Sequence, residues 1–110
     1  MEPLYGILDM LVLRVLLFGP MHGYGIARAI RQGSRDAVQI EFGSLYPALK
    51  RLELKGWIVA SWKMSELNRR AKVYRLTPVG RKQLRQETSE WAEFTSGVAR
   101  LMKPASGEVE

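Results

Sequence analysis

A short helical segment that runs directly into a basic hairpin is the feature that most limits how this chain can fold. Residues 43–55 carry apolar side chains at helical spacing, and Gly56 follows as a helix stop. The residues predicted to be buried on this helix are Leu45, Ala48, Leu49 and Leu52. Segments 57–63 and 72–77 are rich in β-branched and aromatic residues, and the polar segment 64–71 between them suits a hairpin loop. This order of elements predicts a winged helix-turn-helix.

Two further helices are predicted before this unit. Apolar residues recur at helical spacing over residues 4–18, and Gly19-Pro20 then interrupts the pattern. A second, short helix should begin near His22 and end near Gly33, because glycine is a common helix stop. Residues 34–42 are predicted to form the connecting loop.

Capping residues locate the start of the third helix. Ser44 is a suitable N-cap, and Pro47 is tolerated in a first helical turn, where its missing N–H group would have no partner. We therefore expect this helix to begin at Gly43-Ser44. Its apolar side should pack on the domain, while the opposite side stays free to bind a ligand.

A long helix is predicted at the C-terminal end. Thr77 can cap it, Pro78 suits its first position, and the pattern then continues without a breaker to Lys103. Apolar residues on this helix are spaced like the seam of two packed helices: Leu84, Trp91, Phe94, Val98 and Leu101. The stripe could also pack on its own domain, but the small size of the chain and the length of the helix favour a homodimer.

The chain is expected to have a mainly α fold with a small β-hairpin and a long C-terminal helix. A length of 110 residues leaves little room for a second hydrophobic core. The predicted organisation is a winged helix-turn-helix DNA-binding domain over residues 1–77, a dimerisation helix over 78–103 and a flexible tail over 104–110. The absence of cysteine fits a cytoplasmic location. The longest apolar run, 10–18, is too short to span a membrane, and no signal peptide precedes it.

Positive charge is concentrated in one part of the chain. The net charge is +6, and residues 63–85 hold eight Lys and Arg residues against a single acidic residue, Glu66. A concentrated basic patch on an otherwise balanced domain is the pattern expected of a protein that binds the phosphate backbone of nucleic acid. A basic face that is merely solvated is the alternative.

Catalysis has little support in the sequence. His22 is the only histidine, cysteine is absent, and no glycine-rich phosphate loop or spaced pair of carboxylates occurs. His22 is predicted to have a structural role, in which a ring nitrogen satisfies a backbone group near the start of the second helix. We predict no enzyme activity, no cofactor and no metal site.

These features together resemble the PadR family of transcriptional regulators. The resemblance extends from residue 6 to about residue 103 and rests on segments 6–13, 22–26, 43–52 and 69–80. A single C-terminal helix is similar to the short-tailed branch of the family. The chain departs from the family pattern at Asn68, where many members have glycine, and at Val73, where they often have an aromatic residue.

The resemblance implies a dimer that binds double-stranded DNA, with the third helix in the major groove of each half-site. The residues predicted on the reading surface of that helix are Ser44, Tyr46, Pro47, Lys50 and Arg51. The basic hairpin should contact phosphates, through Lys63, Arg69, Arg70 and Lys72. A dimer of this kind would prefer an inverted repeat and act by default as a repressor.

Trp91 has a second predicted role. In short-tailed relatives an aromatic residue at this place lines a pocket between the subunits that receives flat apolar ligands. The residues expected to line such a pocket here are Leu8, Val12, Trp91 and Phe94. Burial at a dimer interface also explains a tryptophan, and the sequence leaves both roles open.

Two other kinds of partner remain as alternatives. A winged helix can dock a protein and bind no duplex, although such a module rarely needs its arginines and lysines concentrated on the hairpin. RNA is a weaker alternative, because it would favour exposed aromatic residues on a sheet for base stacking. Charge placement therefore favours duplex DNA.

Overall fold

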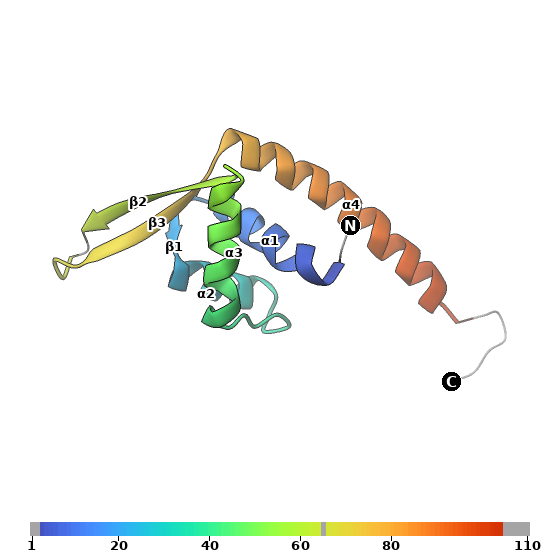
Figure 1. Cartoon of the computed structure of the whole chain (residues 1–110). Coiled ribbons are helices and arrows are strands. Elements are labelled where there is room, and N and C mark those ends of the chain that lie inside the picture. Colours follow the sequence, from blue (N-terminus) through green and yellow to red (C-terminus); the bar gives the residue numbers. More distant parts are fainter. Residues whose placement is uncertain (1–2, 65, 105–110) are drawn as a thin grey trace.

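Helices and strands follow one another along the chain in the computed structural model, which describes residues 3–64 and 66–104. The elements are α1 (Pro3–Leu16), β1 (Met21–His22), α2 (Gly23–Gly33), α3 (Phe42–Leu54), β2 (Ile58–Met64), β3 (Arg70–Leu76) and α4 (Pro78–Met102). Figure 1 shows the β2–β3 hairpin projecting to one side of the molecule, while α4 runs past α1 toward the other side. The predicted fold class is confirmed. Apart from Pro104, the predicted tail lies outside the described residues.

The hairpin carries a third strand that the sequence analysis did not predict. β1 pairs antiparallel with β3, with Met21 opposite Tyr74 and His22 opposite Val73, so the sheet order is β1-β3-β2. A strand of two residues has no periodicity of its own, because its pairing depends entirely on a distant segment. Its effect is to hold the start of α2 against the base of the hairpin.

One hydrophobic core joins the helices to the sheet. Its buried members are Met10, Val12, Leu13, Leu16, Ile26, Ile30, Leu45, Leu49, Leu52, Ile58, Tyr74, Leu76 and Leu84. The buried face predicted for α3 is confirmed, since its four apolar residues are all buried. The apolar run in α1 therefore belongs to a core helix, and none of the helices in the described residues has the length and apolarity to cross a membrane.

The start of α3 differs from the prediction. The helix begins at Phe42, and its N-cap is Glu41, whose carbonyl oxygen accepts from the backbone N–H groups of Ser44 and Leu45. Ser44 is thus the third residue of the helix and not its cap. Pro47 is the sixth residue, so its missing N–H removes one internal helical bond, to the carbonyl of Gly43. The prediction failed because a cap made by backbone atoms leaves no mark on the sequence.

The connection between the hairpin and α4 is tightly built. The Thr77 side chain accepts from the backbone N–H of Gly80 over 3.0 Å and donates to the carbonyl of Gly56 over 2.7 Å. The predicted cap at Thr77 is therefore confirmed, with Pro78 in the first turn. Gly80 has no room for a side chain, because a Cβ atom there would overlap the carbonyl oxygen of Trp57. The hairpin and α4 are consequently held at one fixed junction.

Candidate nucleic-acid interface

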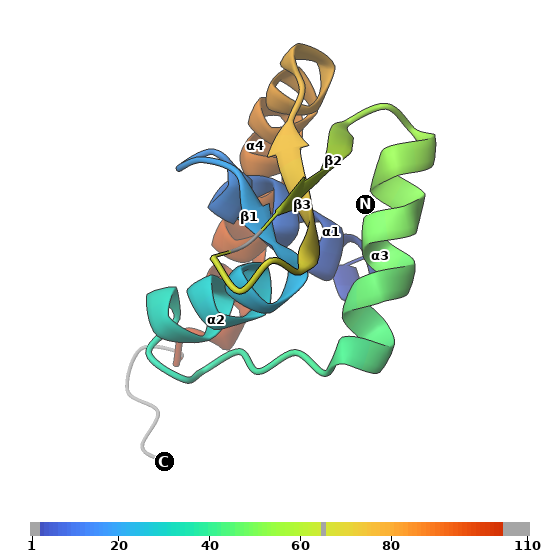
Figure 2. The ribbon, with the colours of Figure 1, turned by 90° about the vertical axis from the view of Figure 1, so that its left-hand side faces the viewer.

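The polar face of α3 is open to solvent. Figure 2 shows α3 along one edge of the molecule, with the hairpin in the middle and α2 on the other side. The predicted reading residues are all exposed: Ser44, Tyr46, Pro47, Lys50 and Arg51. The sequence periodicity thus separates the two faces of α3 as expected, because helical residues three and four apart share a face.

Arg51 differs from the other residues on this face because it is bound to α1. Its Nη2 atom donates to Oδ1 of Asp9 over 2.8 Å, and the Asp9 side chain is only 11% exposed, against 48% for Arg51. A sheltered carboxylate needs a charged partner, since burying an unpaired charge is costly. Arg51 therefore holds α3 on α1 while half of its side chain remains at the surface.

Lys72 on β3 is also engaged within the chain. Its Nζ atom lies 3.3 Å from Oε1 of Glu53 on α3 and 5.5 Å from the centre of the Tyr74 ring. The hydrogen bond to Glu53 raises the pKa of Lys72 above its ordinary value of 10.5. Lys72 was predicted to bind phosphate, and its ammonium group lies against Glu53 of α3.

An arginine stacks on a tryptophan at the outer part of the hairpin. The Arg70 guanidinium lies 4.7 Å from the centre of the Trp62 ring, and Trp62 is 58% exposed. A guanidinium held over an aromatic face keeps its N–H groups at the rim, where they can still donate to an anion. Trp62 was not among the predicted site residues. The Trp62 ring therefore holds the Arg70 guanidinium as an exposed, preorganised cation on the hairpin.

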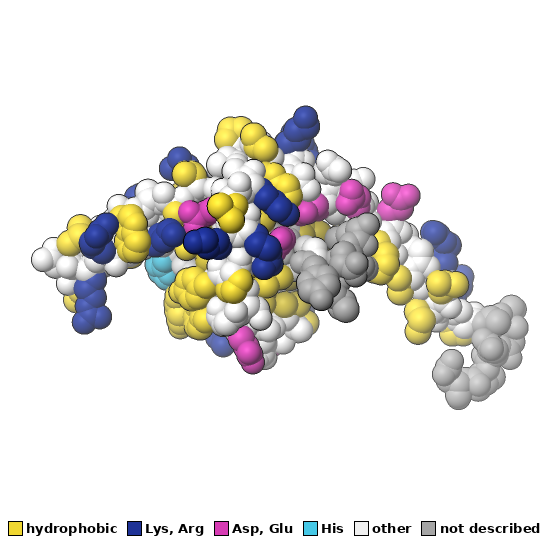
Figure 3. Space-filling model, viewed as in Figure 1, with side chains coloured by type: hydrophobic (Ala, Val, Ile, Leu, Met, Phe, Trp, Pro, Cys, Tyr) yellow, Lys and Arg dark blue, Asp and Glu magenta, His cyan; other side chains and the backbone are white. Residues whose placement is uncertain are grey.

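The backbone conformation at the tip of the hairpin accounts for the asparagine at position 68. Asn68 adopts a left-handed conformation with φ of 58°, which asparagine tolerates better than most residues other than glycine. Glycine, the residue that the resemblance predicts here, would adopt the same conformation without strain. The neighbouring basic residues Lys63, Arg69 and Arg70 are exposed, and Figure 3 shows Lys and Arg side chains following the hairpin toward α3.

The apolar stripe on α4 divides into two parts. Leu84 is 4% exposed and lies in the core of its own chain, so its burial needs no second subunit. The stripe then becomes exposed toward the C-terminal end of the helix, where Phe94 and Val98 are each 41% exposed and Leu101 is 85% exposed. The predicted seam is thus shared between the core and the surface.

The four residues predicted to line a ligand pocket are not equivalent. Val12 is fully buried in the core, so it offers no surface to a ligand, and Leu8 is half-buried. Trp91 packs partly on the core, with the centre of its ring 5.9 Å from that of Phe94. A ligand could therefore reach the pair of rings and part of Leu8, but not Val12.

His22 has the structural position that the sequence predicts. It is the N-cap of α2, and its Nδ1 atom accepts from the backbone N–H of Gly25 over 2.9 Å. Within the described part of the chain, no three His, Asp or Glu side chains come together as metal ligands.

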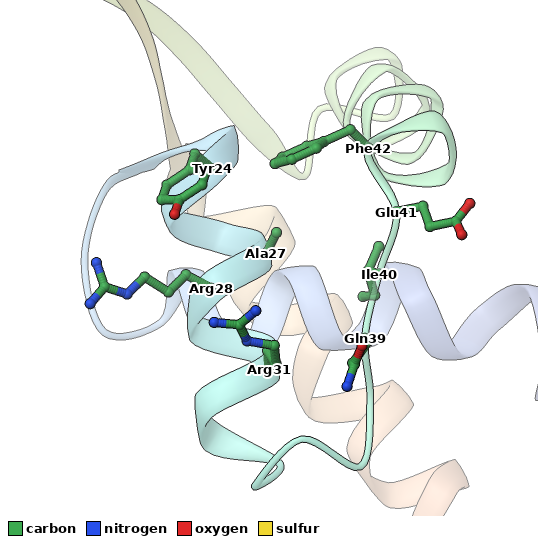
Figure 4. Close-up of a pocket in the computed structure, with 8 residues that line it drawn as sticks. All are labelled: Tyr24, Ala27, Arg28, Arg31, Gln39, Ile40, Glu41 and Phe42. Atoms are coloured by element: carbon green, nitrogen blue, oxygen red, sulfur yellow. The ribbon is translucent and has the colours of Figure 1, made fainter.

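Two exposed aromatic residues beside the reading face were missed by the sequence analysis. Tyr24 near the start of α2 and Phe42 at the start of α3 are 60% and 43% exposed, and both line a hollow of about 280 Å³. Figure 4 shows this hollow between α2 and the segment that leads into α3. An aromatic residue at the end of the polar segment 34–42 was a usable signal for Phe42, but only the fold brings Phe42 and Tyr24 together.

Comparison with known proteins supports a regulatory role. The family model described as the transcriptional regulator PadR-like family matches residues 12–86. An uncharacterized protein X of Lysinibacillus sphaericus is 34% identical over 88 residues, which cover 80% of this chain and 81% of that protein. The transcriptional regulator Rv3488 of Mycobacterium tuberculosis is 34% identical over 78 residues, which cover 71% and 69% of the two chains.

Solved structures agree with the family match. A transcriptional regulator from Clostridium thermocellum superposes with a TM-score of 0.83 at 30% identity, covering 94% of this chain and 97% of the other. A PadR family transcription regulator from Clostridium difficile gives a TM-score of 0.76 at 28% identity, covering 87% and 98%. With the exposed face of α3 and the basic hairpin beside it, these matches show that the chain belongs to the PadR-like family of transcriptional regulators.

Proposed function

We propose that the protein is a dimeric repressor that binds an inverted-repeat operator, with α3 of each subunit in the major groove and the hairpin on the flanking backbone. The observation that carries this proposal is the continuity of two surfaces. α3 contacts β2 and is joined to β3 by the Lys72–Glu53 ion pair at 3.3 Å. The outer part of the same hairpin presents the exposed residues Lys63, Arg69 and Arg70. One duplex can therefore meet both surfaces at once.

The two surfaces would have different tasks. N-terminal residues of a recognition helix meet base edges, so Ser44 and Tyr46 in the first turns of α3 and Lys50 one turn later are suited to base contacts. Arg51, held by Asp9, donates its remaining N–H groups toward the groove or the backbone. Hairpin cations supply affinity that depends little on sequence, since phosphates are the same at every base pair.

Dimerisation would use the exposed end of the α4 stripe. Phe94, Val98 and Leu101 are large apolar side chains on one face of a helix that projects past α1 (Figure 1). Covering them with a second α4 removes apolar surface from water, which stabilises the pair by about 25 cal/mol for each Å² buried. Two subunits related by a twofold axis present two α3 helices to symmetric half-sites.

A flat apolar molecule that stacks on the ring pair of Trp91 and Phe94 would bind at this same seam. Its binding would change how the two α4 helices pack and so the spacing of the two α3 helices. Release of DNA would follow from that change in spacing. Quenching of Trp91 fluorescence by such a molecule, absent in Trp91→Phe, tests this part of the proposal alone.

The operator is tested by selection from a pool of random duplexes, followed by sequencing of the bound fraction. The proposal expects an enriched inverted repeat whose half-site centres lie about one helical turn, 10 to 10.5 base pairs, or a multiple of it, apart. A pool bound by the double variant Arg69→Ala, Arg70→Ala serves as the control and should yield the same motif with weaker retention. Enrichment of a single, unrepeated half-site would contradict the dimeric mode of binding.

A further inference from the structure

Three aromatic side chains form a stacked row on the surface between α2 and α3. The ring centres of Tyr24 and Phe42 are 6.2 Å apart with planes inclined by 19°, and those of Phe42 and Tyr46 are 5.8 Å apart with planes inclined by 25°. His22 continues the row, at 6.2 Å from Tyr24. We call Tyr24, Phe42 and Tyr46 the aromatic ladder.

The aromatic ladder is not part of the hydrophobic core. Tyr24, Phe42 and Tyr46 are 60%, 43% and 50% exposed, so each ring leaves a large apolar surface in water. Contiguous exposed aromatic residues are typical of binding surfaces, because they bury much area with little loss of side-chain freedom. The row therefore has the character of an interface for which the fold itself supplies no partner.

Close packing fixes the position of the ladder. A Cβ atom at Gly23 would lie 3.0 Å from both Cε1 and Oη of Tyr46, so the absence of a side chain at Gly23 lets the Tyr46 ring rest on the first turn of α2. Phe42 is the first residue of α3, and Tyr46 follows one turn later. The ladder is thus preorganised at the N-terminal end of the recognition helix.

Two arginines border the ladder, and one of them has an acidic partner, since Arg31 Nε lies 3.6 Å from Oδ1 of Asp36. Arg28 and Arg31 line the hollow next to Tyr24 and Phe42, and in Figure 4 the Glu41 side chain points away from that hollow. In Figure 3 hydrophobic side chains gather beside the histidine, on the side of the molecule along which Lys and Arg side chains follow the hairpin. An apolar row bordered by guanidinium groups complements a DNA groove edge, where apolar methyl groups lie between phosphates.

We infer that the aromatic ladder extends the DNA-reading surface and that Phe42 packs on the C5-methyl group of a thymine at the edge of each half-site. This methyl group is the one apolar feature that the major groove presents, and it distinguishes thymine from the other bases. Tyr24 and Tyr46, stacked on either side, hold the Phe42 ring in place. Arg28 and Arg31 face the adjoining phosphates. The inference rests on the proposed function, since it needs α3 in the groove.

The test replaces thymine by deoxyuridine, which differs only by lacking the methyl group. An operator is first selected with the wild-type protein, and each thymine of a half-site is then replaced in turn in a labelled duplex. At one position near the half-site edge, the wild-type protein should bind the deoxyuridine duplex about fourfold more weakly, the effect expected for one buried methyl group. Phe42→Ala should bind the thymine duplex more weakly and should bind both duplexes equally.

Two control variants make the test specific. Lys50→Ala, which leaves the ladder intact, should weaken binding and keep the fourfold preference for thymine at that position. Tyr24→Ala, which removes one neighbour of Phe42 without touching α3, should reduce the preference while circular dichroism shows an unchanged helix content. A preference that survives in Phe42→Ala, or a selected operator without thymine at the half-site edge, would overturn the inference.

The outcomes also separate this inference from the proposed function. If the wild-type protein selects no duplex, the proposed function fails before any deoxyuridine is tested. If it selects an operator but binds thymine and deoxyuridine duplexes equally, only the inference fails. If Phe42→Ala changes the oligomeric state of the protein in sedimentation and leaves the thymine preference intact, the ladder is a protein–protein contact. The inference is then also overturned.

Discussion

The guanidinium of Arg51 and the carboxylate of Asp9 meet over 2.8 Å and join two helices whose contacting residues are 42 positions apart in the sequence. The contact links the helix proposed to read DNA to α1, which also packs against α4. Because Asp9 is almost fully buried, the pair fixes where α3 lies relative to the rest of the chain.

Removal of Arg51 should cost more stability than removal of the charge on Asp9. Arg51→Leu leaves a buried carboxylate unpaired and should lower the free energy of unfolding by about 2 kcal/mol, less than for a fully buried pair because Arg51 is half exposed. Asp9→Asn keeps an acceptor for Arg51 and should cost about 1 kcal/mol. Urea denaturation measures both. Lys50→Leu, the exposed neighbour, should stay within about 0.5 kcal/mol of the wild type; equal losses at Lys50 and Arg51 would contradict this account.

Two glycines in α4 should respond oppositely to substitution by alanine. Gly80→Ala places a methyl group on the Trp57 carbonyl and should destabilise the protein by about 2 kcal/mol or more. Gly97→Ala meets only the end of the Arg100 side chain, at 3.6 Å, and should stabilise the helix by about 0.5 to 1 kcal/mol. Thermal unfolding measures the change in stability of each variant relative to the wild type. A Gly80→Ala protein as stable as the wild type would show that the junction between the hairpin and α4 can shift to make room for the methyl group.

Glu87 on α4 should make the stability of the protein depend on pH. Burial raises the pKa of its carboxyl group, with smaller contributions from Asp9 and Glu90, while Gln83 and Lys55 act in the opposite direction. Its Oε2 atom is buried without a hydrogen-bond partner among the described residues. A raised folded-state pKa means that the ionised form is penalised in the folded protein, so Glu87 lowers stability above that pKa and this penalty vanishes below the unfolded value of 4.5.

Glu87→Gln should accordingly raise the melting temperature at pH 7, and the gain should shrink to nothing as the pH falls below 4.5. Calorimetry across this pH range provides the measurement. The exposed Glu93→Gln serves as the matched control on the same helix. A gain that is constant with pH would show that packing, and not the charge, is responsible.

The hairpin and α3 should contribute differently to DNA binding. Arg70→Ala removes a cation from the Trp62 ring and should weaken binding to every duplex alike, with the slope of log K against log salt becoming shallower by about one. Lys50→Ala should instead reduce the preference for the operator over a scrambled duplex. Competition binding at several salt concentrations separates the two effects. The reverse pattern would exchange the roles assigned to the two surfaces.

Charge on the exposed part of the α4 stripe should separate the proposed dimer. Val98→Glu and Leu101→Glu each place a carboxylate where a second helix would pack, and sedimentation velocity should then show monomers at concentrations where the wild type is dimeric. Ala99→Glu, one position outside the stripe, should leave the dimer intact. Dimers that survive both stripe substitutions would locate the subunit interface elsewhere.

The regular parts of the fold were predictable because local periodicity determines them. The buried face of α3 follows from apolar residues at helical spacing, and the cap at Thr77 follows from Thr77-Pro78. Features that depend on distant segments were not predictable in the same way. β1 exists because β3 lies beside it, and the start of α3 depends on the backbone of Glu41.

The site shows the same division. The exposure of Lys50 follows from its place on the α3 helix, whereas the ion pair of Lys72 with Glu53 depends on where the fold places β3 relative to α3. The place of Lys72 on the basic hairpin led to the prediction that it contacts phosphates, and that role stays a prediction. The stacking of Phe42 between Tyr24 and Tyr46 likewise brings together rings from two helices, and the loop between those helices hides their proximity in the sequence.

Fluorescence anisotropy of a labelled duplex tests the central claim most directly. The duplex carries the DNA upstream of the protein's own gene, a scrambled duplex of the same composition is the reference, and both are titrated with wild-type protein over a series of salt concentrations. The protein should bind the upstream DNA tightly and the scrambled duplex more weakly. The affinity for both duplexes should fall steeply as salt increases. For each phosphate contacted, log K should fall by about 0.9 for a tenfold rise in salt concentration. Equal, weak binding to both duplexes with little dependence on salt would contradict the claim that α3 and the hairpin form a DNA-reading surface.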